Sequence, residues 1–373
     1  MPERLRLVDL VNARLDEFLT ARANHLSTVA DELDVFIEAS RDLLSGGKRF
    51  RALFAYWGWH SVAGAVRPDD LLADLDEHPE LDAVVSLAAA LEIFHAAALV
   101  HDDIMDRSDT RRGMASAHRR FEADHVAREW VGSAPSYGMS SALLLGDLLL
   151  GWSDELLAEG LSAVADRSAT RRARSEFHLM RTEVTAGQYL DILEEVAWRS
   201  AAEDELLPRA HRVVVYKSAK YSIEAPLALG GLMAGGTAEQ VSALRAFGLP
   251  LGVAFQLRDD LLGVFGDPVV TGKPAGDDLR EGKRTVLIAL ARRALPGSAV
   301  RLIDELLGDP ELTDHQISTL QATIRDSGAV DTVEQMISRS VREAVAAIES
   351  APLSRSARSE LVGLSQLVTR RAH

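Results

Sequence analysis

Residues 91–106 read LEIFHAAALVHDDIMD. The stretch is apolar up to Val100 apart from Glu92 and His95, and it then carries Asp102 and Asp106. Apolar residues here and just upstream recur every three or four positions, which predicts a core helix. On a helix these two aspartates stack on one face, and carboxylates ~4 Å apart repel by about 4 kcal/mol at an effective dielectric constant of 20. The stretch therefore predicts a buried helix whose end attracts a cation.

A second aspartate pair has the same setting. Residues 255–262 read FQLRDDLL, so Asp259 and Asp260 also follow an apolar helical run. The chain has no cysteine, and carboxylate ligands favour a hard cation. Mg²⁺ is the expected metal because it commonly bridges a few carboxylates to substrate phosphates. One such cluster alone could equally be an acidic helix end, but two of them in apolar helices favour metal binding.

Basic residues stand beside both acidic clusters. Arginine can hold a phosphate with two hydrogen bonds, and glycine lets the backbone approach a ligand closely. Any one of these basic motifs alone could be a surface turn. The motifs are Lys48 and Arg51 after Gly46 and Gly47, Arg111 and Arg112 before Gly113, Lys217 and Lys220, and Lys273 and Lys283. Together they predict a polyanionic substrate bridged by metal ions.

Composition excludes several classes of protein. The 373 residues include 41 Lys and Arg against 56 Asp and Glu, a net charge of −15, which argues against nucleic-acid binding. The absence of cysteine excludes a disulfide scaffold, a zinc–cysteine site and a thiol nucleophile. Helical periodicity dominates, strand signals are sparse and residues 213–216 are ambiguous. We expect an all-α protein with loops at 67–81, 130–137 and 266–282.

No targeting or membrane segment is evident. The N-terminus is charged from Glu3 onward and lacks a secretory signal pattern. No uncharged apolar run reaches the roughly 18 residues of a membrane span. No loop looks like a domain linker, so residues 1–373 are expected to form a single cytoplasmic domain.

The motifs together resemble the trans-type isoprenyl diphosphate synthases, the polyprenyl synthetase family that includes farnesyl and geranylgeranyl diphosphate synthases. All of them stand in the family's order, within about residues 40–290. The matching stretches are GGKRFR at 46–51, LEIFHAAALVHDDIMDRSDTRRG at 91–113, GDLLL at 146–150, GQYLD at 187–191, KSA at 217–219, FQLRDDLLGVFGD at 255–267 and GKPAGDDLREGKRT at 272–285.

The resemblance implies a helical bundle around a deep central cavity, a homodimer, and about three Mg²⁺ ions at the active site. The implied metal ligands are Asp102, Asp103, Asp106, Asp259 and Asp260. The implied pocket for isopentenyl diphosphate consists of Lys48, Arg51 and His95, with Arg112 beside it. The implied allylic diphosphate site consists of Arg111, Lys217, Lys273 and Lys283. Ser218 and Gln188 match polar positions near the developing carbocation.

One position departs from the family pattern. Gly263 stands where the second motif has a third aspartate. In this family the first aspartate of that motif does most of the metal ligation. Activity is therefore expected to survive the change.

The residues before Asp102 bear on product length. Ala98 and Ala97 lie four and five residues upstream, and Phe94 lies eight upstream, about 12 Å along the helix. Because Ala97 and Ala98 are small and Phe94 is bulky, the sequence predicts a cavity that is longer than a farnesyl chain. Phe94 is expected to end this cavity near the length of a geranylgeranyl chain. Alternatively, the alanines pack against a neighbouring helix and another helix forms the floor.

Other proteins would share some of these motifs. A farnesyl or longer polyprenyl diphosphate synthase would share every motif. A class I terpene cyclase would carry an Asn/Ser/Glu-type second metal motif in place of Asp259 and Asp260. A non-catalytic partner subunit of a heteromeric synthase would have lost part of the aspartate or basic motifs, which are intact here.

Overall fold

The computed structural model describes residues 2–64, 79–267 and 276–369. The first elements along the chain are α1 (Pro2–Leu26), η1 (Asp31–Leu33), α2 (Asp34–Leu44), α3 (Phe50–Ala63), α4 (Pro79–Met105), β1 (Thr110–Arg111), β2 (Met114–Ala115), α5 (Ala117–Ala127), α6 (Ala134–Ser162) and α7 (Arg167–Ala197). Then come η4 (Trp198–Ser200), α8 (Glu203–Val213), η5 (Val214–Glu224), α9 (Ala225–Met233) and α10 (Ala238–Phe265). The last are α12 (Asp277–Glu281), α13 (Val286–Ala294), α14 (Gly297–Leu306), α15 (Asp314–Asp326), α16 (Ala329–Glu349) and α17 (Arg355–Thr369).

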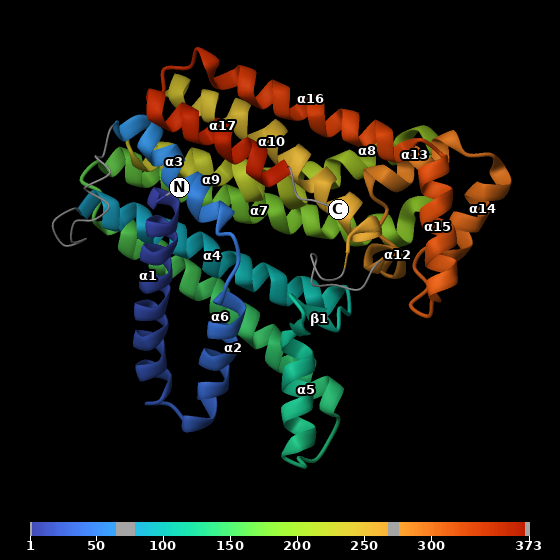
Figure 1. The fold of residues 1–373 in the computed structure, drawn as a ribbon. Helices are drawn as coiled ribbons and strands as arrows, with labels where there is room; N and C mark the ends of the chain where they lie inside the picture. Colours follow the sequence, from blue (N-terminus) through green and yellow to red (C-terminus); the bar gives the residue numbers. More distant parts are fainter. Residues whose placement is uncertain (1, 65–78, 268–275, 370–373) are drawn as a thin grey trace. The chain divides into compact units, whose positions relative to one another are not determined.

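The prediction of an all-α protein is confirmed (Figure 1). The ambiguous residues 213–216 are helical and belong to the junction of α8 and η5. Two expected loops are partly helical, because α6 begins at Ala134 and α12 lies within 266–282. Of the loop expected at 67–81, residues 67–78 lie outside the described residues.

Contacts divide the chain into two compact units. Unit 1 consists of Met1–Arg174 and Leu229–Thr237, and unit 2 of Ser175–Ala228 and Ala238–His373. The prediction that residues 1–373 form a single domain stays a prediction.

Helix α4 is the centre of unit 1. It packs against α1, α2, α3, α5 and α6, and Val84, Leu87 and Leu91 along it are fully buried. Figure 1 shows α1 and α2 side by side, joined by a short connection that includes η1. Helix α6 begins with a proline in its first turn and with Ser133 as N-cap, which accepts a hydrogen bond from the backbone of Ser136. Because α4 is packed on several sides, the aspartates at its end are attached to a well-packed core.

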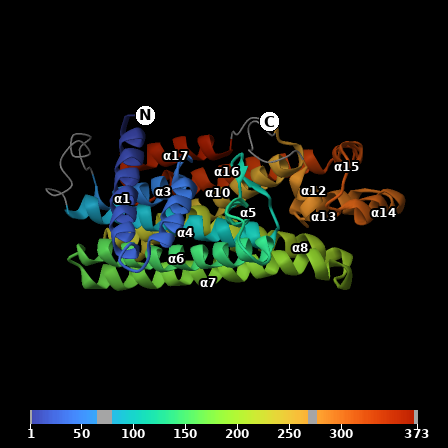
Figure 2. The same cartoon turned by 90° about the horizontal axis from the view of Figure 1, so that it is seen from below.

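Helix α10 is the centre of unit 2. It packs against η5, α12, α13, α16 and α17, and α16 and α17 run beside it in Figure 1. Helices α13, α14 and α15 lie together near one end of α16 (Figure 2). A capping box begins α15, where Thr313 and Gln316 satisfy each other's backbone N–H groups.

Within the described part of the chain, one helix is long and apolar enough to cross a membrane, namely α4. Its most apolar 18-residue stretch is 83% buried. Such burial is typical of the core helix of a soluble protein.

Candidate active site

An arginine joins the first two aspartates at the end of α4. Asp103 is buried, and the Nε of Arg111 donates hydrogen bonds to its two carboxylate oxygens over 2.9 and 3.2 Å. The same guanidinium lies 3.6 Å from Oδ2 of Asp102. The backbone N–H of Asp106 donates to the carbonyl of Asp102, so the helical turn continues to the third aspartate. Asp102 and Asp106 are more exposed than Asp103.

A two-residue hairpin places the two arginines that follow. Strands β1 and β2 pair Arg111 with Met114, so Arg112 and Gly113 form the turn. Both turn residues have positive φ, 54° and 76°, as a type I′ turn requires. The N–H groups of the Arg112 side chain donate to the carbonyls of Leu43 and Ser45 over 3.3 and 3.1 Å. The hairpin therefore holds Arg112 against the glycine turn after α2.

The positive charges of four arginines act on His95. Burial lowers the pKa of His95 well below 6.5, and the positive charges of Arg51, Arg112, Arg111 and Arg49 lower it further. His95 is therefore neutral at pH 7 and can donate one hydrogen bond to an anion. Two of these arginines face protein carboxylates, Arg49 facing Glu92 and Arg111 facing Asp103, and a bound anion would further stabilise the group. The cluster is suited to bind a diphosphate.

A buried ion pair anchors the start of α3. Arg49 has a left-handed backbone, with φ at 50°, and its guanidinium donates to Glu92 over 3.1 Å and to Asn12 over 3.0 Å. Oε1 of Glu92 in turn accepts from the backbone N–H of Ala52, 3.4 Å away. Arg49 is therefore fastened to α4, while the neighbouring Lys48 is exposed and Arg51 half-buried.

In unit 2 a single carboxylate holds two of the predicted lysines. Nζ of Lys217 lies 2.5 Å from Oδ2 of Asp191, and Nζ of Lys283 lies 3.2 Å from the same oxygen. Lys283 also pairs with Glu195 over 3.0 Å. Asp191 thus brings together lysines that lie 66 residues apart in the sequence.

Lys217 and Ser218 lie on a π-helix, η5. Such helices are rare and often occur at functional sites. Helix α7 approaches η5 at Gly187, where an added Cβ would stand 2.3 Å from the backbone nitrogen of Lys217. Only glycine fits there, which explains the first residue of the GQYLD motif. Gln188 and Ser218 are half-buried.

The second aspartate pair lies near the end of α10. Asp259 is half-buried and Asp260 is buried. Nε2 of Gln256 donates to Oδ1 of Asp260 over 2.8 Å, whereas the buried Oδ2 has no hydrogen-bond partner among the described residues. Burial raises the pKa of Asp260 well above its ordinary value, and the carboxylates of Asp278, Asp259 and Asp191 raise it further.

These surroundings fit a divalent cation. A buried carboxyl oxygen without a hydrogen-bond partner, on a group whose negative charge is disfavoured by burial, is stabilised either by protonation or by a bound cation. Among the described residues, no three carboxylate or histidine side chains form a metal site by themselves. Mg²⁺ does not need such a cage, because it is usually bound through one or two carboxylates plus substrate phosphates and water.

The remaining predicted residues are placed as follows. Phe94 and Ala97 are buried within unit 1, and Ala98 is half-buried. Lys273 lies outside the described residues. The prediction that Phe94, Ala97 and Ala98 line a central cavity stays a prediction.

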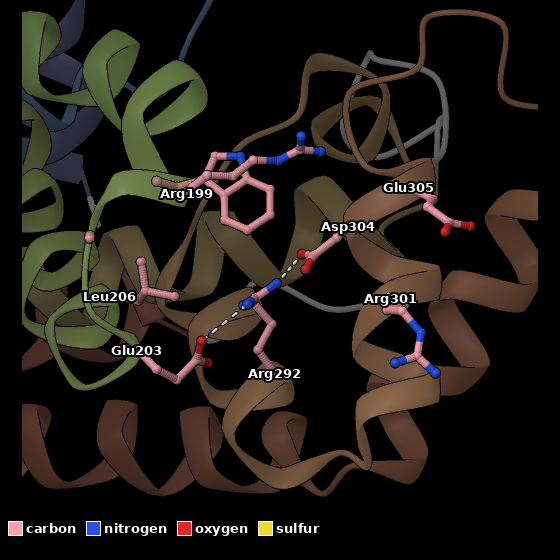
Figure 3. Close-up of a pocket in the computed structure, with 9 residues that line it drawn as sticks. Arg199, Glu203, Leu206, Arg292, Arg301, Asp304 and Glu305 are labelled. Atoms are coloured by element: carbon pink, nitrogen blue, oxygen red, sulfur yellow. Dashed lines mark hydrogen bonds and ion pairs between the residues drawn. The ribbon is translucent and has the colours of Figure 1, made fainter.

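A cavity of about 390 Å³ in unit 2 contains none of the predicted residues. Figure 3 shows Arg292 from α13 joined to Glu203 of α8 and Asp304 of α14. Arg284 lies 3.8 Å from the ring centre of Trp198 and 3.4 Å from Asp304. Burial lowers the pKa of Arg284 to about 10, and the nearby Arg292 adds to this. We interpret the group as an ion-pair network that ties three helices together.

Several important residues escaped the sequence analysis. Asp191 closes the GQYLD motif and Asp278 lies in GKPAGDDLREGKRT, so both stood inside quoted motifs without a role. Arg258 precedes the second aspartate pair but binds Glu334 of α16 over 2.6 and 2.7 Å and the carbonyl of Thr369 over 3.1 Å. It therefore anchors α16 and α17 to α10. The strands β1 and β2 were missed because two residues are too few to show alternation.

Comparison with known proteins places the chain in a family. The model of the polyprenyl synthetase family matches residues 34–324. The chain belongs to the polyprenyl synthetase family. This polyprenyl synthetase is 30% identical to a geranylgeranyl diphosphate synthase of Mycobacterium tuberculosis over 88% of its own length and 81% of the relative's. It is also 30% identical to a geranylfarnesyl diphosphate synthase of Aeropyrum pernix, over 86% and 88% of the two chains.

A solved structure supports the same family assignment. The geranylgeranyl pyrophosphate synthase of Corynebacterium glutamicum, in complex with isoprenyl diphosphate and magnesium, superposes with a TM-score of 0.89 at 37% identity. The match covers 98% of this polyprenyl synthetase and 99% of that chain. The predicted family, the isoprenoid synthase helical fold and the enzyme class are confirmed. The chain is a prenyltransferase, an isoprenyl diphosphate synthase.

Proposed function

We propose that the chain condenses isopentenyl diphosphate with an allylic diphosphate (dimethylallyl, geranyl or farnesyl) in a Mg²⁺-dependent reaction, and that its main product is all-trans geranylgeranyl diphosphate. The observation that carries the proposal is the arrangement in unit 1. The positive charges of four arginines act on a neutral His95, and one of these arginines, Arg111, also contacts Asp102 and Asp103. Anion-binding and cation-binding groups thus meet at one arginine, as a metal-bridged diphosphate requires.

The predicted site residues are proposed to have three separate tasks. Lys48, Arg51, His95 and Arg112 are proposed to bind the head group of isopentenyl diphosphate. Arg111, Lys217, Lys273 and Lys283 are proposed to bind the allylic diphosphate, as cations stabilise the negative charge that grows on a leaving diphosphate. The proposed metal ligands are Asp102, Asp103, Asp106, Asp259 and Asp260. Mg²⁺ bound there would act as a Lewis acid toward the diphosphate oxygens.

Bond changes follow from these tasks. The allylic C–O bond breaks and leaves a carbocation, which the hydroxyl of Ser218 and the amide of Gln188 are proposed to face. The double bond of isopentenyl diphosphate attacks it, a C–C bond forms and one proton leaves. We propose that the departing diphosphate accepts this proton. Apolar helix surfaces exclude water that would otherwise trap the cation.

The product length follows from α4. Ala98 shares the helix face of Asp102, because four residues make about one turn, and Phe94 lies one turn deeper. We propose that Phe94 ends the space available to the growing chain near the geranylgeranyl length.

We further propose a homodimer that acts in the cytoplasm. The side chains of Met139, Leu143 and Leu144 on α6 are 52%, 52% and 56% exposed. Large apolar side chains spaced by four residues on one helix form a patch that a second copy of the chain would cover. Light scattering coupled to size-exclusion chromatography is expected to give twice the 40.5 kDa chain mass. Leu143→Glu is expected to shift the protein to the monomer, whereas a wild-type protein that elutes as a monomer would contradict the proposal.

The reaction itself is tested by incubating purified protein with Mg²⁺, isopentenyl diphosphate and each allylic primer in turn. Product length is read by mass spectrometry. A geranylgeranyl product is expected, and it should disappear when EDTA replaces Mg²⁺.

Other outcomes separate the alternatives. Farnesyl or longer products would keep the reaction and overturn the role of Phe94. Conversion of a long prenyl diphosphate to a hydrocarbon would indicate a terpene cyclase. No turnover with any primer would favour a non-catalytic partner subunit.

A further inference from the structure

Lys220 belongs to a basic motif with Lys217, but the proposed reaction gives it no task. Its Nζ lies 2.5 Å from Oε1 of Glu183 on α7 and 5.0 Å from the ring centre of Tyr216, four residues earlier on η5. The side chains of Lys220 and Glu183 are 24% and 23% exposed, so solvent and salt screen this pair less than a surface pair. The contacts of this ammonium group are therefore with α7 and with η5 itself.

Three residues on one face of α7 meet η5. Glu183, Gly187 and Asp191 follow each other at intervals of four residues, so they lie on the same side of the helix. Asp191 pairs with Lys217 over 2.5 Å. At Gly187 an added Cβ would stand 2.4 Å from the carbonyl carbon of Tyr216. The two helices are therefore in contact from the pair at Asp191 to the pair at Glu183.

Beyond that contact both helices carry acids. Arg245 of α10 joins Glu176 of α7 to Glu224 of η5, over 2.5 and 3.1 Å. Two carboxylates repel each other, so this end needs a cation from a third helix. The only cations in the sequence of η5 are Lys217 and Lys220, and both pair with α7.

The two lysines differ in what else they are expected to bind. Lys217 is proposed to bind the allylic diphosphate, and its ammonium group has three N–H donors to divide between that ligand and Asp191. Its hold on α7 therefore weakens when the substrate arrives. The pair of Lys220 and Glu183 has no such second partner to serve, so it can keep η5 in place throughout.

We propose that Lys220 is a positioning residue, whose contacts with Glu183 and Tyr216 keep η5 in register with α7 while Lys217 binds the allylic diphosphate. This inference rests on the proposed function. A displacement of about 1 Å at a binding group can cost up to about 10²-fold in rate. The loss of Lys220 should therefore be felt at Lys217, although Lys220 does not touch the substrate.

The test is steady-state kinetics in which the two substrates are varied separately. Lys220→Met keeps the length of the side chain and removes its charge. KM for the allylic diphosphate is expected to rise about tenfold, and KM for isopentenyl diphosphate to stay within about twofold of wild type. The residues proposed to bind isopentenyl diphosphate belong to unit 1, whereas η5 belongs to unit 2. A protein that is merely destabilised would lose active enzyme, which lowers kcat and leaves both KM values unchanged.

A reversed ion pair separates position from charge. Glu183→Lys combined with Lys220→Glu rebuilds the pair in the opposite direction, and it is expected to recover most of the loss in KM. Arg22→Met is the matched control, because Arg22 of α1 also joins a carboxylate, Glu155 at 2.6 Å, and a ring, Phe18 at 4.8 Å. It is expected to lower the melting temperature without moving either KM beyond about twofold.

The outcomes separate this inference from the proposed function. An active wild type beside a Lys220→Met variant with an unchanged KM for the allylic diphosphate would overturn the role of Lys220 alone. A reversed pair that restores the melting temperature but not KM would overturn it as well, because the contact would then be structural only. A wild-type protein that elongates no allylic primer would overturn both.

Discussion

Arg111 and Asp103 form a two-point contact in which Nε of the arginine reaches both carboxylate oxygens, over 2.9 and 3.2 Å. Asp103 is buried, so this pair is shielded from solvent. The contact sets the direction of the guanidinium, whose outer nitrogen also lies 3.6 Å from Asp102. The second residue of the first aspartate motif thus orients an arginine, whatever it contributes to metal binding.

Arg111→Lys should test this orientation. Lysine keeps the charge but cannot make the two-point contact. We expect kcat/KM for the allylic substrate to fall by about 10²-fold, the usual effect of removing one preorganised donor from a transition state. Arg119→Lys, which alters an exposed ion pair on α5, should change it less than about twofold. Equal activity of Arg111→Lys and wild type would contradict the proposed role.

The depressed pKa of His95 predicts a pH-dependent stability. In the unfolded chain this histidine takes up a proton below about pH 6.5, whereas in the folded protein it stays neutral to lower pH. The group therefore costs no stability above pH 6.5 and lowers stability as the pH falls below it. Between pH 6.5 and 5.5 the loss is up to about 1 kcal/mol.

The measurement is urea unfolding of wild type and His95→Gln at both pH values. The wild type should lose up to about 1 kcal/mol more than the variant over this interval. His25→Gln, at an exposed position of α1, controls for the removal of a histidine. If wild type and His95→Gln show the same pH dependence, His95 is not held neutral.

Product length should respond to single residues of α4. Ala98 is half-buried, so Ala98→Phe can be accommodated, and it is expected to shorten the product to farnesyl diphosphate. Ala97→Phe is also expected to shorten it, but Ala97 is fully buried, so overpacking should cost about 1–3 kcal/mol of stability. Mass spectrometry of the products and a melting curve of each variant separate the two effects. An unchanged product from both variants would show that these alanines do not line the chain's path.

The opposite change should lengthen the product. Phe94→Ala removes the proposed floor, and products beyond geranylgeranyl are expected. The residue is buried, so a loss of about 3 kcal/mol is expected as well. The assay is therefore run well below the variant's melting temperature. Only geranylgeranyl product from a folded variant would place the floor on another residue.

The ion-pair network at the cavity of Figure 3 should contribute to stability rather than to catalysis. Asp304→Asn leaves Arg292 and Arg284 without their shared carboxylate, and a loss of about 3 kcal/mol is expected. Glu305→Gln removes the same charge from the next residue, which is exposed, and should cost less than about 0.5 kcal/mol. Denaturant unfolding gives both values. A stable Asp304→Asn with altered kinetics would point instead to a functional cavity.

Much of the site could be predicted because its parts are local. Asp102, Asp103 and Asp106 follow one apolar helix, and the structure places them at the end of α4 as expected. Arg111 also lies beside these aspartates, as expected. It and Arg112 are placed there by a hairpin rather than by a loop. Asp191 was missed because its partners, Lys217 and Lys283, come from two other segments. Periodicity along one segment gives no information about contacts between segments that are far apart in the sequence.

The amino-acid sequence by itself determined that the chain is helical, that its core helices end in aspartates, and which family it belongs to. These properties depend on spacing along one segment, where helical periodicity brings residues i and i+4 to the same face. Only the tertiary structure decided which charges meet. Arg111 lies on Asp103, one carboxylate compensates two lysines, and Asp278 fills the space at Gly263. Ion pairs and close approaches act over a few ångströms, so they are set by how helices distant in sequence pack together.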